Sequence, residues 1–158
     1  MKLVFQRVAS ASVTADGVPC GAIGPGAVLL LGVETGDGER EARFLAEKAV
    51  RLRVFSDADG KFRDALTDIG GGVLVVSNFT LCADCRHGRR PDFMKAERPE
   101  PARQLYECFL EALRGFGFEP VSGVFGADMR ITMEADGPVT VVLDTAELLP
   151  KEAGICRS

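Results

Sequence analysis

The sequence predicts a single α+β domain, residues 1–158, in which an antiparallel-rich curved sheet or partial barrel packs with two main helices. Two observations lead to this fold class. Strand-like apolar segments gather toward both ends of the chain with only two amphipathic helical segments between them, and clustered strands favour α+β over a doubly wound sheet. The length of 158 residues also fits one domain, since domains commonly hold about 100–200 residues.

The first strand-like segments turn back on one another. Apolar and β-branched residues at 3–8 and 12–15 lead to an Asp-Gly pair at 16–17, which is a strong turn signal, and the segment 18–23 follows it. After a break rich in glycine and proline, the continuous apolar run 27–33 predicts a buried strand.

Two segments have the spacing of amphipathic helices. In the first, Asp37 is the expected N-cap of a helix that continues to about Arg53, with apolar residues on one face and charges on the other. The second is expected to begin near Pro101, because proline suits a first helical position, and to end near Gly115.

The remaining strands lie between and after these helices. The apolar run 73–76 predicts a buried strand that carries the segment 77–81 at its end. Near the C-terminus, apolar and polar residues alternate at 129–135, an Asp-Gly turn is expected at 136–137, and a final strand is expected at 139–143.

Composition excludes several classes of protein. The longest apolar run, 27–33, is far shorter than the roughly 20 residues that span a bilayer, and we expect no signal peptide. An odd number of cysteines without an export signal predicts reduced thiols in a cytoplasmic protein. The five cysteines are Cys20, Cys82, Cys85, Cys108 and Cys156.

The charge of the chain is acidic overall and basic in one place. A net charge of −4 argues against general nucleic-acid binding. The segment 84–98, however, holds five lysines and arginines against three acidic residues, and a basic patch on an acidic protein can steer one anionic ligand to one place. A solvated loop with mixed charges is the alternative interpretation.

The segment 77–93 collects several residue types that carry chemistry. Cys82 and Cys85 form a Cys-x-x-Cys pair, which can bind zinc or cycle between thiol and disulfide. Zinc needs about four ligands and no second pair lies nearby, so we expect no metal and no cofactor, with a zinc or thiol protein as the alternative. Thr80 is a nucleophile only if a base removes its proton, and the candidate base is His87, the one histidine of the chain.

Gly137 and Pro138 form an unusual pair at the start of an expected strand. A bond before proline is trans by default, and proline removes an amide donor from a ladder. Such a turn leaves backbone carbonyls free to face a ligand, whereas the simpler interpretation is a proline on an edge strand.

Two short stretches together resemble the D-aminoacyl-tRNA deacylase family. The segment 77–81, Ser-Asn-Phe-Thr-Leu, is similar to the family signature Ser-Gln-Phe-Thr-Leu, and 136–140, Asp-Gly-Pro-Val-Thr, is similar to the second signature, Asn-x-Gly-Pro-Val-Thr. The segment 88–106 follows the middle of the family sequence, so the resemblance covers nearly the whole chain in order. The departures include Asn78 for glutamine and Ala135 for asparagine.

The resemblance implies a homodimer that hydrolyses the ester between a D-amino acid, or glycine, and the terminal adenosine of tRNA. A cis Gly137-Pro138 bond of one subunit would reach into the site of the other. Its carbonyl oxygens would accept hydrogen bonds from the substrate ammonium and crowd the place of an L side chain, so that selection works by rejection. Backbone amides around Asn78 and Phe79 would donate to the oxyanion, and the free hydroxyl of the terminal ribose would help activate water.

The resemblance also implies roles for individual residues, on the signatures and on the basic segment. The implied catalytic residues are Ser77, Asn78, Phe79 and Thr80. The implied residues for substrate binding and chirality are Gly137, Pro138, Val139, Thr140 and Arg7, the last as a brace for the Gly-Pro loop. The implied tRNA-binding residues are Phe93, Arg86, Arg89, Arg90 and Lys95.

Two alternatives to this function remain open from the sequence. One keeps the fold and edits L-aminoacyl-tRNA, which a trans Gly137-Pro138 bond would favour. The other is a nucleic-acid-binding module without catalysis, which the changes at Asn78 and Ala135 would permit.

Overall fold

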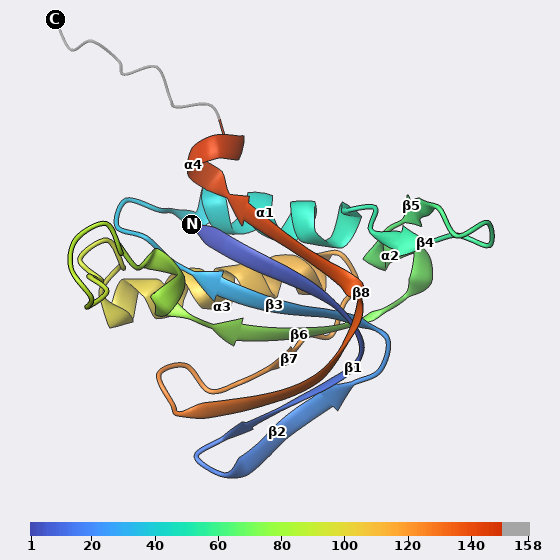
Figure 1. Ribbon diagram of the computed structural model, residues 1–158, viewed down its shortest axis with the longest axis horizontal. Coiled ribbons are helices and arrows are strands. Elements are labelled where there is room, and N and C mark those ends of the chain that lie inside the picture. The colour runs from blue at the N-terminus through green and yellow to red at the C-terminus, as the bar shows by residue number, and fades with distance from the viewer. Residues whose placement is uncertain (150–158) are drawn as a thin grey trace, which may run out of the picture.

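A computed structural model describes residues 1–149 as a strongly curved sheet with two long helices packed on one side (Figure 1). Cys156, one of the cysteines expected to be reduced, lies outside the described residues. The strands are β1 (Lys2–Ala15), β2 (Val18–Ile23), β3 (Gly26–Gly32), β4 (Phe55–Ser56), β5 (Phe62–Asp64), β6 (Gly72–Ser77), β7 (Val121–Ser122) and β8 (Met129–Asp144). The helices are α1 (Glu39–Arg51), α2 (Leu66–Ile69), α3 (Pro99–Gly115) and α4 (Thr145–Leu148), with a 3-10 turn, η1 (Phe79–Cys82).

The main sheet is mixed but mostly antiparallel. Its strand order is β2-β1-β3-β6-β7, with β8 paired to β1, and only the β3–β6 and β6–β7 pairs are parallel. The sheet bends until its first and last strands touch, because Gly21 on β2 lies against Val121 on β7. The prediction of an α+β fold with an antiparallel-rich curved sheet or partial barrel and two main helices is therefore confirmed, and the sheet is nearly closed.

Two apolar clusters stabilise this arrangement. The larger one lies between the sheet and the helices α1 and α3, and it includes Phe5, Leu45 and Phe109, all fully buried. The smaller one lies in the bend of the sheet around Val13 and Leu74. None of the helices in residues 1–149 is long and apolar enough to cross a membrane.

The end of the chain differs from the expectation of a turn at 136–137. The segments 129–135 and 139–143 belong to one strand, β8, which runs antiparallel along β1 from Met129 to Asp144. The register shifts between the pair Gln6–Thr140 and the pair of Val8 with Ala135, so residues 136–139 form a bulge. The expectation was wrong because β1 is long enough to pair on both sides of the bulge, which the local Asp-Gly signal does not reveal.

The first helix also begins differently from the expectation. Its N-cap is Gly38, whose N–H donates to Glu41 Oε2 at 2.9 Å. Asp37 instead accepts a hydrogen bond from the Met1 ammonium at 2.6 Å and another from the Glu34 amide at 2.6 Å. The Asp37 carboxylate, expected to cap the helix, thus binds the distant Met1 ammonium instead.

Candidate active site

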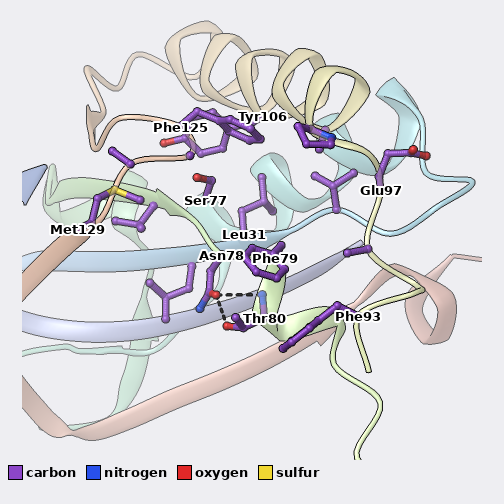
Figure 2. A pocket seen from close by; sticks show the side chains of 18 of the residues that line it. Leu31, Ser77, Asn78, Phe79, Thr80, Phe93, Glu97, Tyr106, Phe125 and Met129 are labelled. Atoms are coloured by element: carbon purple, nitrogen blue, oxygen red, sulfur yellow. Dashed lines mark hydrogen bonds between the residues drawn. The ribbon is translucent and has the colours of Figure 1, made fainter. Parts of the chain in front are cut away.

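A cavity of about 900 Å³ lies where β6 ends and η1 begins, between η1 and the first turns of α3 (Figure 2). Strand β6 delivers the segment 77–80 to this cavity, because the buried strand ends at Ser77 and the chain then turns. The four residues implied as catalytic therefore share one wall. They are Ser77, Asn78, Phe79 and Thr80.

The side chain of Asn78 organises this wall. Its Oδ1 caps η1 by accepting hydrogen bonds from the Thr80 amide, at 3.2 Å, and from the Thr80 hydroxyl. Figure 2 shows both bonds at the floor of the cavity. An asparagine cap satisfies a donor that the start of a helical turn leaves free. Asn78 thus fixes the backbone of the turn that carries Phe79.

The backbone amides of this wall differ in what they donate to. The Asn78 N–H donates to the carbonyl of Leu31 on β3 at 2.8 Å, and the Thr80 N–H donates to Asn78. Within residues 1–149, the Phe79 N–H has no recorded acceptor. The expected oxyanion donors around Asn78 and Phe79 are therefore reduced to the amide of Phe79.

The hydroxyl of Thr80 faces no base. It donates to Asn78 Oδ1, and in the described part of the chain no hydrogen bond joins it to His87, which does not line the cavity. The pair that would form a hydroxyl nucleophile is thus not assembled.

Aromatic rings line both sides of the cavity. Phe79 and Phe93 meet edge to face, with ring centroids 5.1 Å apart, and they are 58% and 37% exposed. Tyr106 and Phe125 lie on the opposite side in Figure 2, with centroids 5.8 Å apart. The Tyr106 hydroxyl donates to the Val75 carbonyl at 3.0 Å, and burial raises the pKa of Tyr106 well above its usual range.

The family resemblance implied a tRNA-binding role for Phe93 but no role for Tyr106 or Phe125. Tyr106 falls on the core face of an amphipathic helix, where an aromatic residue normally signals packing. Phe125 lies in an irregular segment between β7 and β8. Nothing in the sequence around either residue indicates a binding site, so only the fold reveals that both line the cavity.

The two cysteines of the Cys-x-x-Cys pair lie in different environments. Cys82 is fully buried, its Sγ–H donates to the Val33 carbonyl at 3.4 Å, and burial raises the pKa of its thiol to about 11. Cys85 is exposed. Among the described residues no group of three or more His, Cys, Asp or Glu side chains is placed to hold a metal ion. Cys82 therefore behaves as a core residue.

The basic segment forms a short loop beside the cavity. Asp84 and Asp92 exchange two backbone hydrogen bonds of 2.7 and 2.9 Å, which close the loop 85–91. The side chain of Arg86 is bonded to both carboxylate oxygens of Asp84, which lowers the pKa of that carboxyl far below its usual range. Lys95 also reaches Asp84, at 3.6 Å.

The other two arginines of the loop are free. Arg89 and Arg90 are exposed, and within residues 1–149 neither has a recorded ion pair or hydrogen bond. The four basic residues among the five expected tRNA contacts thus divide into two that share the carboxylate of Asp84 and two that face solvent alone.

Gly137 and Pro138 lie outside the cavity, on the exposed bulge of β8, and the bond between them is cis. Arg7 is 7% exposed and holds this bulge, since its Nε donates to the Asp136 carbonyl at 3.3 Å and pairs with Asp136 Oδ2 at 3.0 Å. Thr140, the last residue of the second signature, donates its hydroxyl to Gln6. The predicted site residues therefore form three groups in one chain: one at the cavity, one on the basic loop beside it and one at the bulge.

Known proteins resemble this chain over nearly its whole length. A family model described as D-Tyr-tRNA(Tyr) deacylase matches residues 4–144. The D-aminoacyl-tRNA deacylase of Roseiflexus castenholzii is 53% identical over 146 residues, covering 92% of this chain and 93% of that protein. The D-aminoacyl-tRNA deacylase of Chloroflexus aurantiacus is 52% identical over 155 residues, covering 98% of this chain and 97% of that protein.

Solved structures agree in fold. One described as c-Myc DNA Unwinding Element Binding Protein superposes with a TM-score of 0.85 at 40% identity, covering 91% of this chain and 98% of that one. A probable eukaryotic D-amino acid tRNA deacylase superposes with a TM-score of 0.78 at 14% identity, covering 90% and 98%. On the family match and on relatives about half identical over nearly the full length, this chain belongs to the D-Tyr-tRNA(Tyr) deacylase family.

Proposed function

We propose that this protein hydrolyses the ester bond that joins a D-amino acid to the terminal adenosine of tRNA, releasing the amino acid and the tRNA. One observation carries this proposal. The segment 77–80, which resembles the first family signature, lines a cavity of about 900 Å³, and within residues 1–149 its Phe79 amide has no hydrogen-bond acceptor. The family match over residues 4–144 makes an ester hydrolase the function that this cavity fits.

The chemistry centres on the backbone of η1. Water adds to the ester carbonyl carbon, and the negative oxygen that forms accepts a hydrogen bond from the Phe79 N–H. The C–O bond to the ribose then breaks, and the departing ribose oxygen takes a proton. Removing one such donor commonly costs about 10²–10³ in rate. The neighbouring ribose hydroxyl helps to activate the water, so the Thr80 hydroxyl is a polar contact and not the nucleophile.

The terminal adenine stacks on the exposed rings of Phe79 and Phe93. These rings already lie edge to face at the wall of the cavity, and more than a third of each is exposed. Stacking of a base on an aromatic side chain contributes about 1–3 kcal/mol. The adenosine is thereby held beside the Phe79 amide.

The bulge of one subunit completes the cavity of another in a homodimer. The carbonyls of Gly137 and Pro138 accept hydrogen bonds from the substrate ammonium and fill the place of an L side chain. Support comes from their location, because both are exposed on β8 and neither lines the cavity of its own chain. Val139 and Thr140 anchor the end of the bulge on β1. Glycine has no side chain to reject, so glycine mischarged on alanine tRNA is also a substrate.

The loop 85–91 meets the acceptor end of the tRNA in the cytoplasm. Arg89 and Arg90 contact phosphates directly, whereas Arg86 and Lys95 are partly neutralised by Asp84. Phosphate contacts position a nucleic acid without reading its sequence. This division explains how an acidic protein binds one RNA end without being a general nucleic-acid binder.

A second candidate function is binding of a nucleic acid without catalysis. It is favoured by the 40% identical structure described as a DNA unwinding element binding protein. The change from glutamine to asparagine at position 78 does not support this candidate, since Asn78 still orders the turn around the Phe79 amide.

One assay separates these functions. Purified protein is given D-Tyr-tRNA and L-Tyr-tRNA, and loss of each ester is followed with and without a chelator. We expect loss of the D-ester alone, unaffected by the chelator. Loss of the L-ester instead would identify the related editing activity, and loss of neither, with retention of the tRNA on a filter, would identify a binding module. Loss that the chelator abolishes would restore a metal mechanism.

A further inference from the structure

Two side chains of β1 hold the bulge that carries Gly137 and Pro138: Gln6 Nε2 donates to the Val139 carbonyl at its end, and Arg7 binds its beginning. The guanidinium lies against the bulge itself, because a Cβ added at Gly137 would come within 3.0 Å of Arg7 Nη2. Its Nε binds Asp136 twice, through the carbonyl oxygen and the carboxylate. The position of the Arg7 guanidinium therefore bears directly on the backbone of residues 136 and 137.

Arg7 is itself fixed from a second direction. Its Nη1 donates to the carbonyl of Val54 at 2.7 Å, immediately before the hairpin formed by β4 and β5. This hairpin is anchored in the core by Phe55, which packs edge to face on Phe5 with ring centroids 6.4 Å apart. An ion pair of 3.2 Å between Asp57 and Arg63 braces the hairpin outside the core. The hairpin is thus a firm support for the guanidinium.

The ring of Phe62 on β5 lies under the same guanidinium. Its ring centroid lies 5.4 Å from Arg7 Cζ, within the distance at which a cation is attracted to an aromatic face. Phe62 is 56% exposed and belongs to neither apolar cluster of the described residues, so core packing does not account for its position. An exposed phenylalanine is instead explained by the contact that it makes with Arg7.

We infer that Phe62 is a positioning residue, which acts through Arg7 to hold the carbonyls of Gly137 and Pro138 where they reject the L side chain. The hydrogen bonds of Arg7 lie in the plane of its guanidinium, toward Val54 and Asp136. These hydrogen bonds do not prevent the guanidinium from tilting out of its plane. The ring of Phe62 opposes that tilt. This inference rests on the proposed function, since it concerns the selectivity of the same site.

The test compares kcat/KM for D-Tyr-tRNA and L-Tyr-tRNA in Phe62 variants. Phe62→Leu removes the ring but keeps an apolar side chain, and we expect the D-to-L ratio to fall about two- to fivefold, the factor that a cation–π contact at an exposed site supplies. Phe62→Glu offers Arg7 a carboxylate in competition with Asp136, and we expect a fall of more than about tenfold, the larger size expected of a charged partner. Phe62→Tyr keeps the ring and keeps the ratio.

Two controls separate positioning from a general loss of stability. Val18→Ala changes another exposed apolar residue, 66% exposed on β2, and leaves the ratio unchanged. The Arg7 Nε–H signal in a ¹⁵N spectrum shifts in Phe62→Leu and Phe62→Glu but not in Phe62→Tyr or Val18→Ala.

Each outcome decides one question. An unchanged ratio and an unshifted Arg7 signal in folded Phe62→Glu overturn the inference, even if the wild-type protein is a fully selective D-ester hydrolase. A wild-type protein that hydrolyses neither ester contradicts the proposed function, and the inferred effect on selectivity is then overturned with it. In that case the Arg7 signal still decides whether Phe62 holds the guanidinium.

Discussion

At the scale of single residues, the proposed site depends on a backbone amide more than on a side chain. Ser77 ends a buried strand, Asn78 caps the turn that follows, and together they leave the N–H of Phe79 free at the cavity wall. A substitution that removes only this N–H tests the idea directly.

Proline at position 79 is such a substitution. Proline has no N–H and suits the first position of a helical turn, and Asn78, with ψ of 88°, lies outside the α region that a following proline disfavours. Phe79→Pro also removes the ring, so the matched control is Phe79→Ala, which keeps the amide. We expect kcat for D-Tyr-tRNA to be about 10²–10³ lower in Phe79→Pro than in Phe79→Ala. Single-turnover rates measure the difference, and equal rates in the two folded variants would contradict the role of the amide.

At the scale of elements, the loop 85–91 separates free cations from neutralised ones. Because Arg89 and Arg90 have no ion pair or hydrogen bond within the described residues, each would bring its full charge to the proposed phosphate contact. Arg86 must first leave Asp84, which also retains Lys95. An arginine at position 86 is therefore expected to contribute less to tRNA binding than an arginine at position 89.

We expect Arg89→Ala and Arg90→Ala each to raise KM for D-Tyr-tRNA. Each should also lower the slope of log KM against log salt concentration by about one, because a single phosphate contact is lost. Arg86→Ala is the matched control, with a smaller change in both quantities. A short substrate, D-tyrosyl adenosine, has no acceptor stem, so its KM is expected to stay the same in all three variants. A salt slope that Arg89→Ala and Arg90→Ala leave unchanged would remove the loop from the tRNA-binding surface.

Elements with strong local patterns were predictable from the sequence, whereas long-range partners were not. The run 73–76 and the helix that ends at Gly115 have periodicities that fix their type. Asp37 and the Asp-Gly pair at 136–137 were wrong as a cap and as a turn, because Met1 and the length of β1 decide their roles. The resemblance implied amide donors around Asn78 and Phe79, but the sequence could not show that the Asn78 amide is already bonded, since its acceptor, the carbonyl of Leu31, lies 47 positions before Asn78.

At the scale of the whole molecule, the two halves of the proposed site lie apart in one chain. Arg7 and Phe62 hold Gly137 and Pro138 on an exposed bulge, while the segment 77–80 lines a cavity that neither of them reaches. In the proposed homodimer, the two groups come from different chains. Its activity should then be restored by two different defective chains that pair with each other.

Phe79→Pro and Gly137→Ala form such a pair. The first removes the amide of the cavity, and the second displaces the bulge, because Gly137 has φ of 120° and an added Cβ would lie 2.8 Å from Val139. We expect each variant alone to be poor at D-ester hydrolysis. Co-refolding the two gives mixed dimers, each with one cavity from the Gly137→Ala chain completed by the bulge of the Phe79→Pro chain. The mixture should therefore hydrolyse D-Tyr-tRNA faster than the sum of the separate variants. If each bulge served its own chain, every site in the mixed dimer would carry a defect, and no gain would appear.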